Sequence, residues 1–367
     1  MHDTQLKELS GRTVLVTGGA GLIGSRITRC LRGVGARPLS LCMLDAYPRR
    51  TYRDLFGVDP DDPDVIVGDI QKPDLVREAV AGSDYVIHAA ALADVAACTR
   101  KPMTAIHTNI TGTQVVLDAV ARSERVRRLI FVSSASVYGN GAPEDRAQQD
   151  GECRALRGLL EAVYGRLPSQ LHENARLRPT SVYANTKAWG ERQTALTLGG
   201  VGTSYTVVRY FSVYGEPQVI KRNSHSWVVA WFATRAALGL PLNLNGGGHQ
   251  VRDLVHVDDI ASATVRALVA PRAHNETLNI GTGVPTRVRT VAQLVAERFP
   301  NSRFRETPLP PDDPLGGYAA THRMETVLGW RPTITVEEGI ARYTDWLTRT
   351  PEAIPAWLRT ESKAAST

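Results

Sequence analysis

The chain has 367 residues, of which 43% are hydrophobic and 22% are charged, a composition typical of a globular protein with one large or two medium-sized domains. It contains no apolar run long enough to span a membrane, and its first residues lack the plan of a signal peptide, so we expect a cytoplasmic protein with no membrane partner. The net charge is +6, but the arginines are scattered without a basic run, which argues against a nucleic-acid partner.

A glycine-rich turn is predicted between the first strand and the first helix. The β-branched run at 13–17 is followed by Gly18, Gly21 and Gly24, and then by apolar residues every four positions. The first glycine permits a tight turn, the second lets a pyrophosphate approach the backbone, and the third lets the helix lie close to its strand. We therefore expect a phosphate-binding turn whose free N–H groups at the helix start face the anion.

The next predicted strands end in small or polar residues. The second strand ends at Asp45, at the spacing where a carboxylate takes the ribose hydroxyls of a dinucleotide. A carboxylate there repels a 2′-phosphate and so favours NAD, although Arg49 and Arg50 keep NADP open as an alternative. The following strands end in "GDI" (Asp69–Ile70) and "HAAA" (88–91), which suit a flat ligand. Alternating strands and helices predict an α/β fold with a parallel, doubly wound sheet and a ligand at the carboxyl ends of its strands.

Tyr183 and Lys187 are four residues apart in a predicted helix and therefore lie on one face. Of the eleven tyrosines, only Tyr183 has a lysine at this spacing. A neighbouring ammonium favours the phenolate and lowers the pKa of the phenol from its usual value of ~10, which makes Tyr183 a candidate general base. Upstream, another buried strand runs out into Ser133 and Ser134 in "SSASVYG".

With these residues in place, the chain resembles the extended short-chain dehydrogenase/reductase family, and within it the NAD-dependent nucleotide-sugar epimerases and dehydratases. The segments that carry the resemblance are the glycine turn, Asp45, "GDI", "HAAA", Asn109, "SSASVYG", Tyr-x-x-x-Lys, "RYFSVYG", "GGGHQVRDLVHVDDIA" and "LNIGTG". They extend over nearly the whole chain. The resemblance implies a Rossmann domain that binds NAD and a smaller mixed α/β domain that binds a nucleotide-diphosphate sugar.

The family's roles can be carried over to matching positions. By resemblance, Tyr183 is the general base on a sugar hydroxyl while hydride passes to NAD, Lys187 holds the nicotinamide ribose, and Ser134 hydrogen-bonds the reacting oxygen. The residues assigned in this way to the cofactor are Gly18, Gly21, Leu22, Ile23, Gly24, Asp45, Asp69, Ile70, Ala89, Ala90, Ala91, Asn109, Ser133, Tyr183, Lys187, Tyr210, Ser212 and Val213.

The reaction is suggested by the residues that follow Ser134. The family's 4,6-dehydratases carry Asp-Glu at the positions of Ala135 and Ser136, and its decarboxylating members usually carry Glu at the second of them. Ser-Ala-Ser before Val-Tyr-Gly most resembles the C4-epimerases, so we expect C4 epimerisation of a nucleotide sugar through a transient 4-keto sugar. A 4-keto-sugar reductase that consumes NAD(P)H uses the same residues and stays an alternative. A non-catalytic NAD-binding regulatory protein is a minor alternative.

The resemblance also suggests residues for the sugar nucleotide. Arg252 matches an arginine that contacts the diphosphate, with a surface ion pair to Asp253 or Asp258 as the alternative. Arg323 lies near another arginine region of the family, and Ser212 replaces the family's usual asparagine. The residues expected to contact the substrate are Ser134, Ser136, Ser212, His225, Arg252 and Arg323.

Domain boundaries follow from the order of these motifs. We expect an NAD-binding domain at 11–215 plus 254–272, a sugar-nucleotide domain at 216–253 plus 273–349, and a tail at 350–367. The segment 140–180 is longer than in most relatives and is predicted to be an insertion that either caps the active site or forms a solvated loop. Helices near 104–121 and 182–199 correspond to a pair with which relatives dimerise, which suggests a homodimer.

The four cysteines lack the spacing of metal ligands. Cys30, Cys42, Cys98 and Cys153 are scattered along the chain, so we expect reduced thiols and no metal site.

Overall fold

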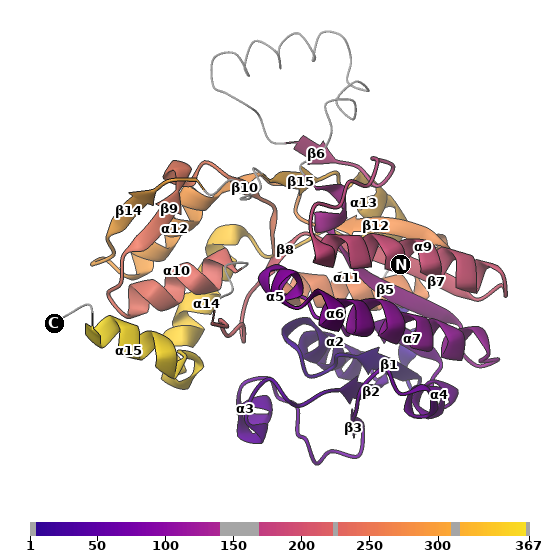
Figure 1. Cartoon of the computed structure of the whole chain (residues 1–367). Helices are drawn as coiled ribbons and strands as arrows, with labels where there is room; N and C mark the ends of the chain where they lie inside the picture. The colour runs from indigo at the N-terminus through magenta and orange to yellow at the C-terminus, as the bar shows by residue number, and fades with distance from the viewer. Residues whose placement is uncertain (1–4, 140–168, 223–226, 310–315, 365–367) are drawn as a thin grey trace, which may run out of the picture.

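The computed structural model describes residues 5–139, 169–222, 227–309 and 316–364 (Figure 1). Its largest element is a parallel seven-stranded sheet in the order β12-β7-β5-β4-β1-β2-β3. These strands are β1 (Thr13–Thr17), β2 (Arg37–Cys42), β3 (Val65–Val67), β4 (Tyr85–His88), β5 (Arg128–Ser134), β7 (Ser204–Tyr210) and β12 (Glu276–Ile280). The predicted parallel sheet is therefore confirmed.

Helices cover both faces of this sheet. The principal ones are α2 (Leu22–Gly33), α4 (Pro73–Ala81), α7 (Gly112–Ala121), α9 (Val182–Gly199) and α11 (Val257–Val269). The two faces can be followed along β1, where Val14 and Val16 pack in one core cluster with Ile27 of α2, while Leu15 packs in another with Val76 of α4. Because successive side chains of a strand point to opposite faces, this alternation confirms the doubly wound arrangement.

A smaller mixed α/β unit stands beside the sheet, at the left of Figure 1. Its elements are α10 (Val228–Ala237), β9 (Leu242–Asn245), β10 (Val251–Arg252), β13 (Thr286–Arg287), α12 (Val288–Arg298), β14 (Phe304–Thr307), α14 (Val336–Arg349) and α15 (Ala356–Ala364). β9 pairs in parallel with β14, and β10 pairs antiparallel with β13. The helices close over these strands around a core of their own, which includes Val229, Leu242, Val291 and Ile340.

Two pairs of short strands join segments that are distant in sequence. β8 (Ser212–Tyr214) pairs in parallel with β11 (Leu254–His256), and β6 (Ser169–Leu171) pairs in parallel with β15 (Gly317–Ala319). The remaining short helices are η1 (Lys7–Leu9), α3 (Arg49–Asp54), α5 (Val95–Arg100), α6 (Pro102–Ile106), η2 (His107–Thr111), η3 (Ala135–Tyr138), η5 (Gly246–Gly248), η6 (Pro271–Ala273), α13 (His322–Leu328) and η7 (Pro351–Ala353).

Two of the expected boundaries differ from the structure. We assigned all of 273–349 to the smaller unit, but β12 forms the edge of the large sheet, and Met324 and Leu328 of α13 pack in the core on that sheet. We also expected a tail after residue 349, whereas α15 is helical and its Leu358 is fully buried in the smaller core. Both differences have one cause, the burial of apolar side chains against elements distant in sequence.

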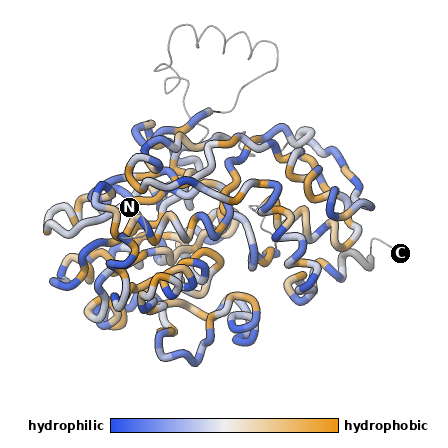
Figure 2. The backbone as a smooth tube through the Cα atoms, turned by 180° about the vertical axis from the view of Figure 1, so that it is seen from behind, coloured by the Kyte–Doolittle hydropathy of each residue, from blue (hydrophilic) through white to orange (hydrophobic). Residues whose placement is uncertain are grey.

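Hydrophobic and hydrophilic positions are interspersed along the described parts of the backbone (Figure 2). Within the described ranges, no helix combines the length and the apolarity that crossing a bilayer requires.

The close packing of the glycine turn gives a first prediction. A Cβ on Gly24 would lie 2.2 Å from the carbonyl oxygen of Gly18, whereas a Cβ on Gly33 of the same helix would meet nothing within 4 Å. Gly24→Ala should therefore lower the free energy of unfolding by about 1–3 kcal/mol. Gly33→Ala is the matched control and should be neutral or raise stability by about 0.5 kcal/mol. Urea unfolding of the two variants checks this, and equal stabilities would contradict it.

Candidate active site

In the turn between β1 and α2, two of the three glycines are tightly packed and the third has more space around it. Gly18 has φ +74°, and a Cβ there would lie 2.9 Å from the Cα of Ala90, so the turn packs against the end of β4. A Cβ on Gly21 would meet only the Gly18 carbonyl oxygen, at 3.4 Å. Gly21 is also the N-cap of α2, and it has no side chain to accept from the N–H groups of the first turn, including those of Leu22 and Ile23. This backbone cradle fits the pyrophosphate of a dinucleotide.

Asp45 lies three residues beyond β2, where its carboxylate is exposed. The loop that carries it is held by the hydroxyl of Tyr52, which accepts hydrogen bonds from the backbone N–H groups of Ala46 at 3.0 Å and Tyr47 at 3.3 Å. Arg49 is engaged elsewhere, in an ion pair with Asp61. The structure therefore leaves a carboxylate, rather than the Arg49 guanidinium, at the position predicted to bind the ribose hydroxyls.

The ends of β3 and β4 supply the small and polar residues that the sequence predicted there. Asp69 caps the turn after β3 by accepting from the backbone N–H of Gln71 at 2.9 Å, and Ile70 is buried beside it. Ala89, Ala90 and Ala91 are half-buried beyond the end of β4. Ala90 lies next to the glycine turn, against Gly18.

A buried histidine connects β1, β4 and the following helix. The hydroxyl of Thr17 accepts from the Ala90 N–H at 3.1 Å, so it donates its own proton to Nδ1 of His88 at 2.8 Å. The Thr113 hydroxyl donates to the carbonyl of Asn109 and therefore accepts from Nε2 of His88 at 2.9 Å. Burial lowers the pKa of His88 to about 3, so the ring is neutral with its proton on Nε2.

Asn109 lies in η2, a π-helical turn between α6 and α7. Its amide accepts from the N–H of Leu92 at 2.8 Å and donates to the Leu92 carbonyl and to the hydroxyl of Thr186, both at 3.1 Å. Asn109 was predicted to contact the cofactor. In the structure its side chain instead ties the chain after β4 to α9, the helix that carries Tyr183.

The predicted catalytic residues meet at the carboxyl end of β5. Ser134 is the last residue of that strand, and Tyr183 lies in the first turn of α9, where the Ser181 hydroxyl accepts from the Ala184 N–H. The Tyr183 phenol lies close enough to the Ser134 side chain for the serine to lower the pKa of the phenol, while the Ser134 hydroxyl accepts from the Ser136 N–H at 3.2 Å. The Lys187 Nζ lies 6.0 Å from the centroid of the Tyr183 ring. One phenol, one hydroxyl and one ammonium are therefore gathered in a half-buried site.

Burial controls the acidity of these groups. It raises the pKa of Tyr183 to about 12, against the smaller lowering effect of the Ser134 hydrogen bond, and it lowers the pKa of Lys187 to about 8. We predicted that the lysine lowers the pKa of the phenol. In the protein alone, desolvation dominates, no lowering by Lys187 is found, and the phenol is protonated at neutral pH. A cation bound next to Tyr183 would favour the phenolate.

Two predicted cofactor residues direct their side chains elsewhere. The Ser133 hydroxyl donates to Oε1 of Glu191 at 2.5 Å, and the Tyr210 hydroxyl is hydrogen-bonded to Thr264 of α11 at 2.6 Å. Ser212 and Val213 are half-buried in β8, where Ser212 donates its N–H to the carbonyl of Asp253. The side chains of Ser133 and Tyr210 are therefore engaged in contacts other than the predicted one.

The Ser136 hydroxyl differs from those of Ser133 and Tyr210 in its hydrogen bonding. Ser136 lies two residues beyond Ser134, and its Oγ is buried without a hydrogen-bond partner among the described residues. A buried hydroxyl without a partner is costly, so this atom is well suited to bind a polar group of a substrate.

Arg252 and Asp253 are adjacent in sequence, but their side chains contact different groups. Arg252 lies in β10 and donates to the carbonyl of Val251 at 2.8 Å. The Asp253 carboxylate accepts from the N–H groups of Thr282, Gly283 and Ala319 and from the Thr282 hydroxyl; Asp258 lies 3.6 Å from Arg26. Asp253 thus joins three segments of chain, and the alternative of an Arg252 ion pair with either aspartate gains no support.

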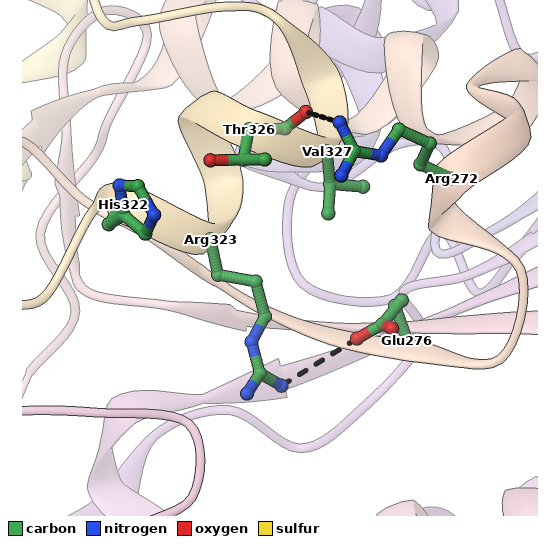
Figure 3. Close-up of a pocket in the computed structure, with 6 residues that line it drawn as sticks. All are labelled: Arg272, Glu276, His322, Arg323, Thr326 and Val327. Atoms are coloured by element: carbon green, nitrogen blue, oxygen red, sulfur yellow. Dashed lines mark hydrogen bonds and ion pairs between the residues drawn. The ribbon is translucent and has the colours of Figure 1, made fainter.

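Arg323 lies in α13, which packs beside β12 at the edge of the large sheet. It lines a surface pocket with Arg272, Glu276, His322, Thr326 and Val327 (Figure 3). Its guanidinium donates to Asn174 at 2.7 Å and to the carbonyl of Thr277 within β12, and pairs with Glu276 at 3.6 Å. The structure therefore does not bring Arg323 to Ser134 and Tyr183. His225 and residues 140–168 of the predicted insertion lie outside the described residues.

One further cluster contains metal-ligand types. Donor atoms of Glu216, His256 and Asp258 lie within 4.8 Å of one another. The guanidinium of Arg26 lies 3.4 Å from the Glu216 carboxylate and 3.6 Å from that of Asp258, so an arginine supplies the positive charge in this structure.

Sequence reasoning missed two residues that shape the site. Glu191, one helical turn after Lys187, is buried in α9 and forms a two-bonded ion pair with Arg209 of β7. Its spacing from Lys187 was a usable signal, since a charged residue on the same face as a predicted catalytic pair needs a partner when the face is buried.

Comparisons with known proteins agree with this geometry. The model of the NAD dependent epimerase/dehydratase family matches residues 14–158 and 161–281. The dTDP-L-rhamnose 4-epimerase of Burkholderia thailandensis is 26% identical over 371 residues, covering 95% of this chain and 98% of that protein. The dTDP-glucose 4,6-dehydratase of Streptomyces antibioticus is 30% identical over 347 residues, covering 91% of both. The solved UDP-glucose 4-epimerase of Thermus thermophilus in complex with NAD is 28% identical, with a TM-score of 0.74 over 91% of this chain and 98% of that one.

The exposed carboxylate of Asp45 gives the prediction of this subsection. Asp45→Ala should weaken NAD binding roughly tenfold, because one charge-assisted pair of hydrogen bonds is lost, and should weaken NADP binding less. Asp54→Ala, an exposed aspartate of α3, is the matched control and should bind NAD as the unmodified protein does. Dissociation constants from calorimetry decide, and unchanged NAD affinity in Asp45→Ala would contradict the assignment.

Proposed function

Since the chain belongs to the NAD-dependent epimerase/dehydratase family, we propose that it is an enzyme that inverts the C4 hydroxyl of a nucleotide-diphosphate sugar. One observation carries the proposal. Tyr183 lies next to Ser134 and to a buried Lys187, while Ala135 and Ser136 stand where the family's dehydratases have an acid and a base. The chain therefore has the groups for moving a proton at a sugar hydroxyl, and lacks those for removing water from the sugar.

The residues of the chain handle the proton and the reacting oxygen. Bound NAD supplies the acceptor, and later the donor, of the hydride. Tyr183 takes the proton of the C4 hydroxyl and returns it after the 4-keto sugar has turned over, with Ser134 hydrogen-bonded to the same oxygen. Lys187 holds the nicotinamide ribose and stabilises the phenolate. No net oxidation results, so the cofactor does not have to leave between turnovers.

The sugar has to rotate, so the binding energy comes from the part of the substrate that does not react. Arg252, at the end of β10, is the proposed contact to the diphosphate, since a guanidinium matches phosphate oxygens with two donors. The unpaired hydroxyl of Ser136 is the proposed contact to the sugar. Ser212 provides a shorter side chain than the asparagine usual in the family.

Two other reactions of the same family are distinguishable from this proposal. A 4-keto-sugar reductase needs the same three residues but consumes one reduced nicotinamide for each sugar. A 4,6-dehydratase is as similar in sequence as the epimerases are, since the Streptomyces enzyme is 30% identical. Ala135 and Ser136 carry no carboxylate, which is why we favour epimerisation.

A homodimer is part of the proposal. The helices expected to form it, α7 and α9, pack against each other, and Leu196 of α9 exposes 60% of its surface. Met103 of α6, the helical segment before α7, exposes 59%. Large apolar side chains on neighbouring helices are suited to a second copy of the chain.

The deciding experiment follows the sugar and the cofactor together. The protein is incubated with NAD and a panel of UDP- and dTDP-sugars, the configuration at C4 is followed by NMR, and absorbance reports the reduced nicotinamide. Inversion at C4 without net reduction and without solvent deuterium at C4 is expected. Stoichiometric loss of NADH with a 4-keto sugar, or formation of a 4-keto-6-deoxy sugar, would replace the proposal with the reductase or the dehydratase.

The role of the phenol gives a separate prediction. Tyr183→Phe should lower kcat by roughly a hundredfold or more while KM changes little, because the proton acceptor is lost and the aromatic ring is kept. In the unmodified protein, kcat should rise with pH through the pKa of Tyr183, since the ionised phenol is the active form. Tyr205→Phe, at the amino end of β7, is the control and should retain full activity. Full activity in Tyr183→Phe would remove that residue from the mechanism.

A further inference from the structure

Consecutive residues of β5 contact α9. A Cβ on Gly190 would lie 2.3 Å from the ring of Phe131, so this glycine lets the helix approach the strand closely. Next along the strand, the carbonyl of Val132 accepts from the Lys187 Nζ at 2.8 Å. The Ser133 hydroxyl donates to Glu191, and the Ser134 side chain lies close enough to Tyr183 to lower the pKa of the phenol.

The Ser133–Glu191 contact is a side-chain hydrogen bond between two residues that lie outside the reacting groups. Oε1 of Glu191 accepts from the Ser133 hydroxyl at 2.5 Å and from Nε of Arg209 at 2.9 Å, and Oε2 accepts from Nη2 of Arg209 at 2.6 Å. Arg209 donates in addition to the Tyr138 hydroxyl at 2.7 Å. All four side chains are buried, so the carboxylate has no freedom to move without leaving Arg209 unpaired.

Burying this ion pair costs desolvation free energy, and stability alone does not account for it. A buried ion pair often contributes no more to stability than apolar residues of similar volume. The ion pair with Arg209 fixes the position of the Glu191 carboxylate. That carboxylate in turn holds Ser133, the residue before Ser134.

We propose that Glu191 and Ser133 are positioning residues for the reaction: their hydrogen bond fixes the end of β5 against α9, and thereby keeps the Ser134 hydroxyl within bonding distance of the Tyr183 phenol. This inference rests on the proposed function for its kinetic consequence. The geometric part, that Ser133 controls the Ser134–Tyr183 bond, does not depend on which sugar reacts.

The negative charge of Glu191 also supports the proposed site, through its effect on Lys187. Its carboxylate raises the pKa of Lys187 against the lowering effect of burial, so it helps keep the ammonium charged beside the phenol. The groups that face Lys187 are Tyr183 and Glu191 on its own helix, the Cys98 thiol on α5, and the neutral His88 on β4. Glu191 is the one permanent negative charge in this set.

The test uses Ser133→Ala, which removes the hydroxyl without altering any charge. The ionisation of Tyr183 is followed first, from the tyrosinate absorbance of the NAD-loaded protein with a Tyr183→Phe variant of the same background subtracted. Loss of the Ser134 hydrogen bond should raise the midpoint by about one pH unit, because that bond favours the phenolate. On a reactive sugar nucleotide, kcat should fall roughly tenfold and KM should stay unchanged.

Two further variants separate positioning from stability. Ser133→Thr keeps the hydroxyl and should restore both the midpoint and kcat. Tyr138→Phe removes a buried hydrogen bond of Arg209 without touching Ser133, and should leave the midpoint in place even though the protein is less stable. An unchanged midpoint in Ser133→Ala, or an equal shift in Tyr138→Phe, would overturn the inference. If the unmodified protein inverts no sugar, the proposed function fails while the titration still decides the role of Ser133.

Discussion

The close contact between α9 and β5 is the constraint on which the site depends. Tyr183 and Lys187 come from the helix and Ser134 comes from the strand, so none of them is useful unless the two elements keep a fixed separation and register. Gly190 sets the separation, because any side chain there would meet the ring of Phe131. The register is set by bonds from Lys187 and Glu191 to the backbone and side chain of the strand.

Hydrogen bonds between uncharged groups connect this rigid contact to the predicted cofactor site. The line from the Ala90 N–H through Thr17, His88 and Thr113 to the Asn109 carbonyl fixes the ends of β1 and β4 relative to the π-helical turn. The Asn109 side chain then bonds to Thr186 of α9. The floor of the predicted dinucleotide site and the helix with the candidate base are therefore one connected body, and a low pKa at His88 keeps it intact over the physiological range.

Local patterns in the sequence were enough for the strands, the glycine turn and the Tyr183–Lys187 pair, because each depends on residues close in the chain. Local patterns could not predict packing between segments that are distant in sequence. Leu358 is buried by helices of the smaller unit, so a segment that looked like a tail is part of a core. Arg323 resembled a substrate ligand, yet it is held by Asn174 and Glu276 on another edge. Ser133 was assigned to the cofactor because the sequence does not reveal that its hydroxyl meets Glu191.

The charges around the phenol suggest how burial and reactivity are reconciled. Lys187 and Arg209 bring two positive charges into the interior, and Glu191 brings one negative charge. A phenolate on Tyr183 would bring this buried set to neutrality, whereas a protonated phenol leaves it with an excess cation. Desolvation nevertheless keeps the phenol protonated in the protein alone, with a pKa of about 12. Burial therefore outweighs any attraction between these cations and a phenolate, and a further positive charge bound next to the ring would favour ionisation.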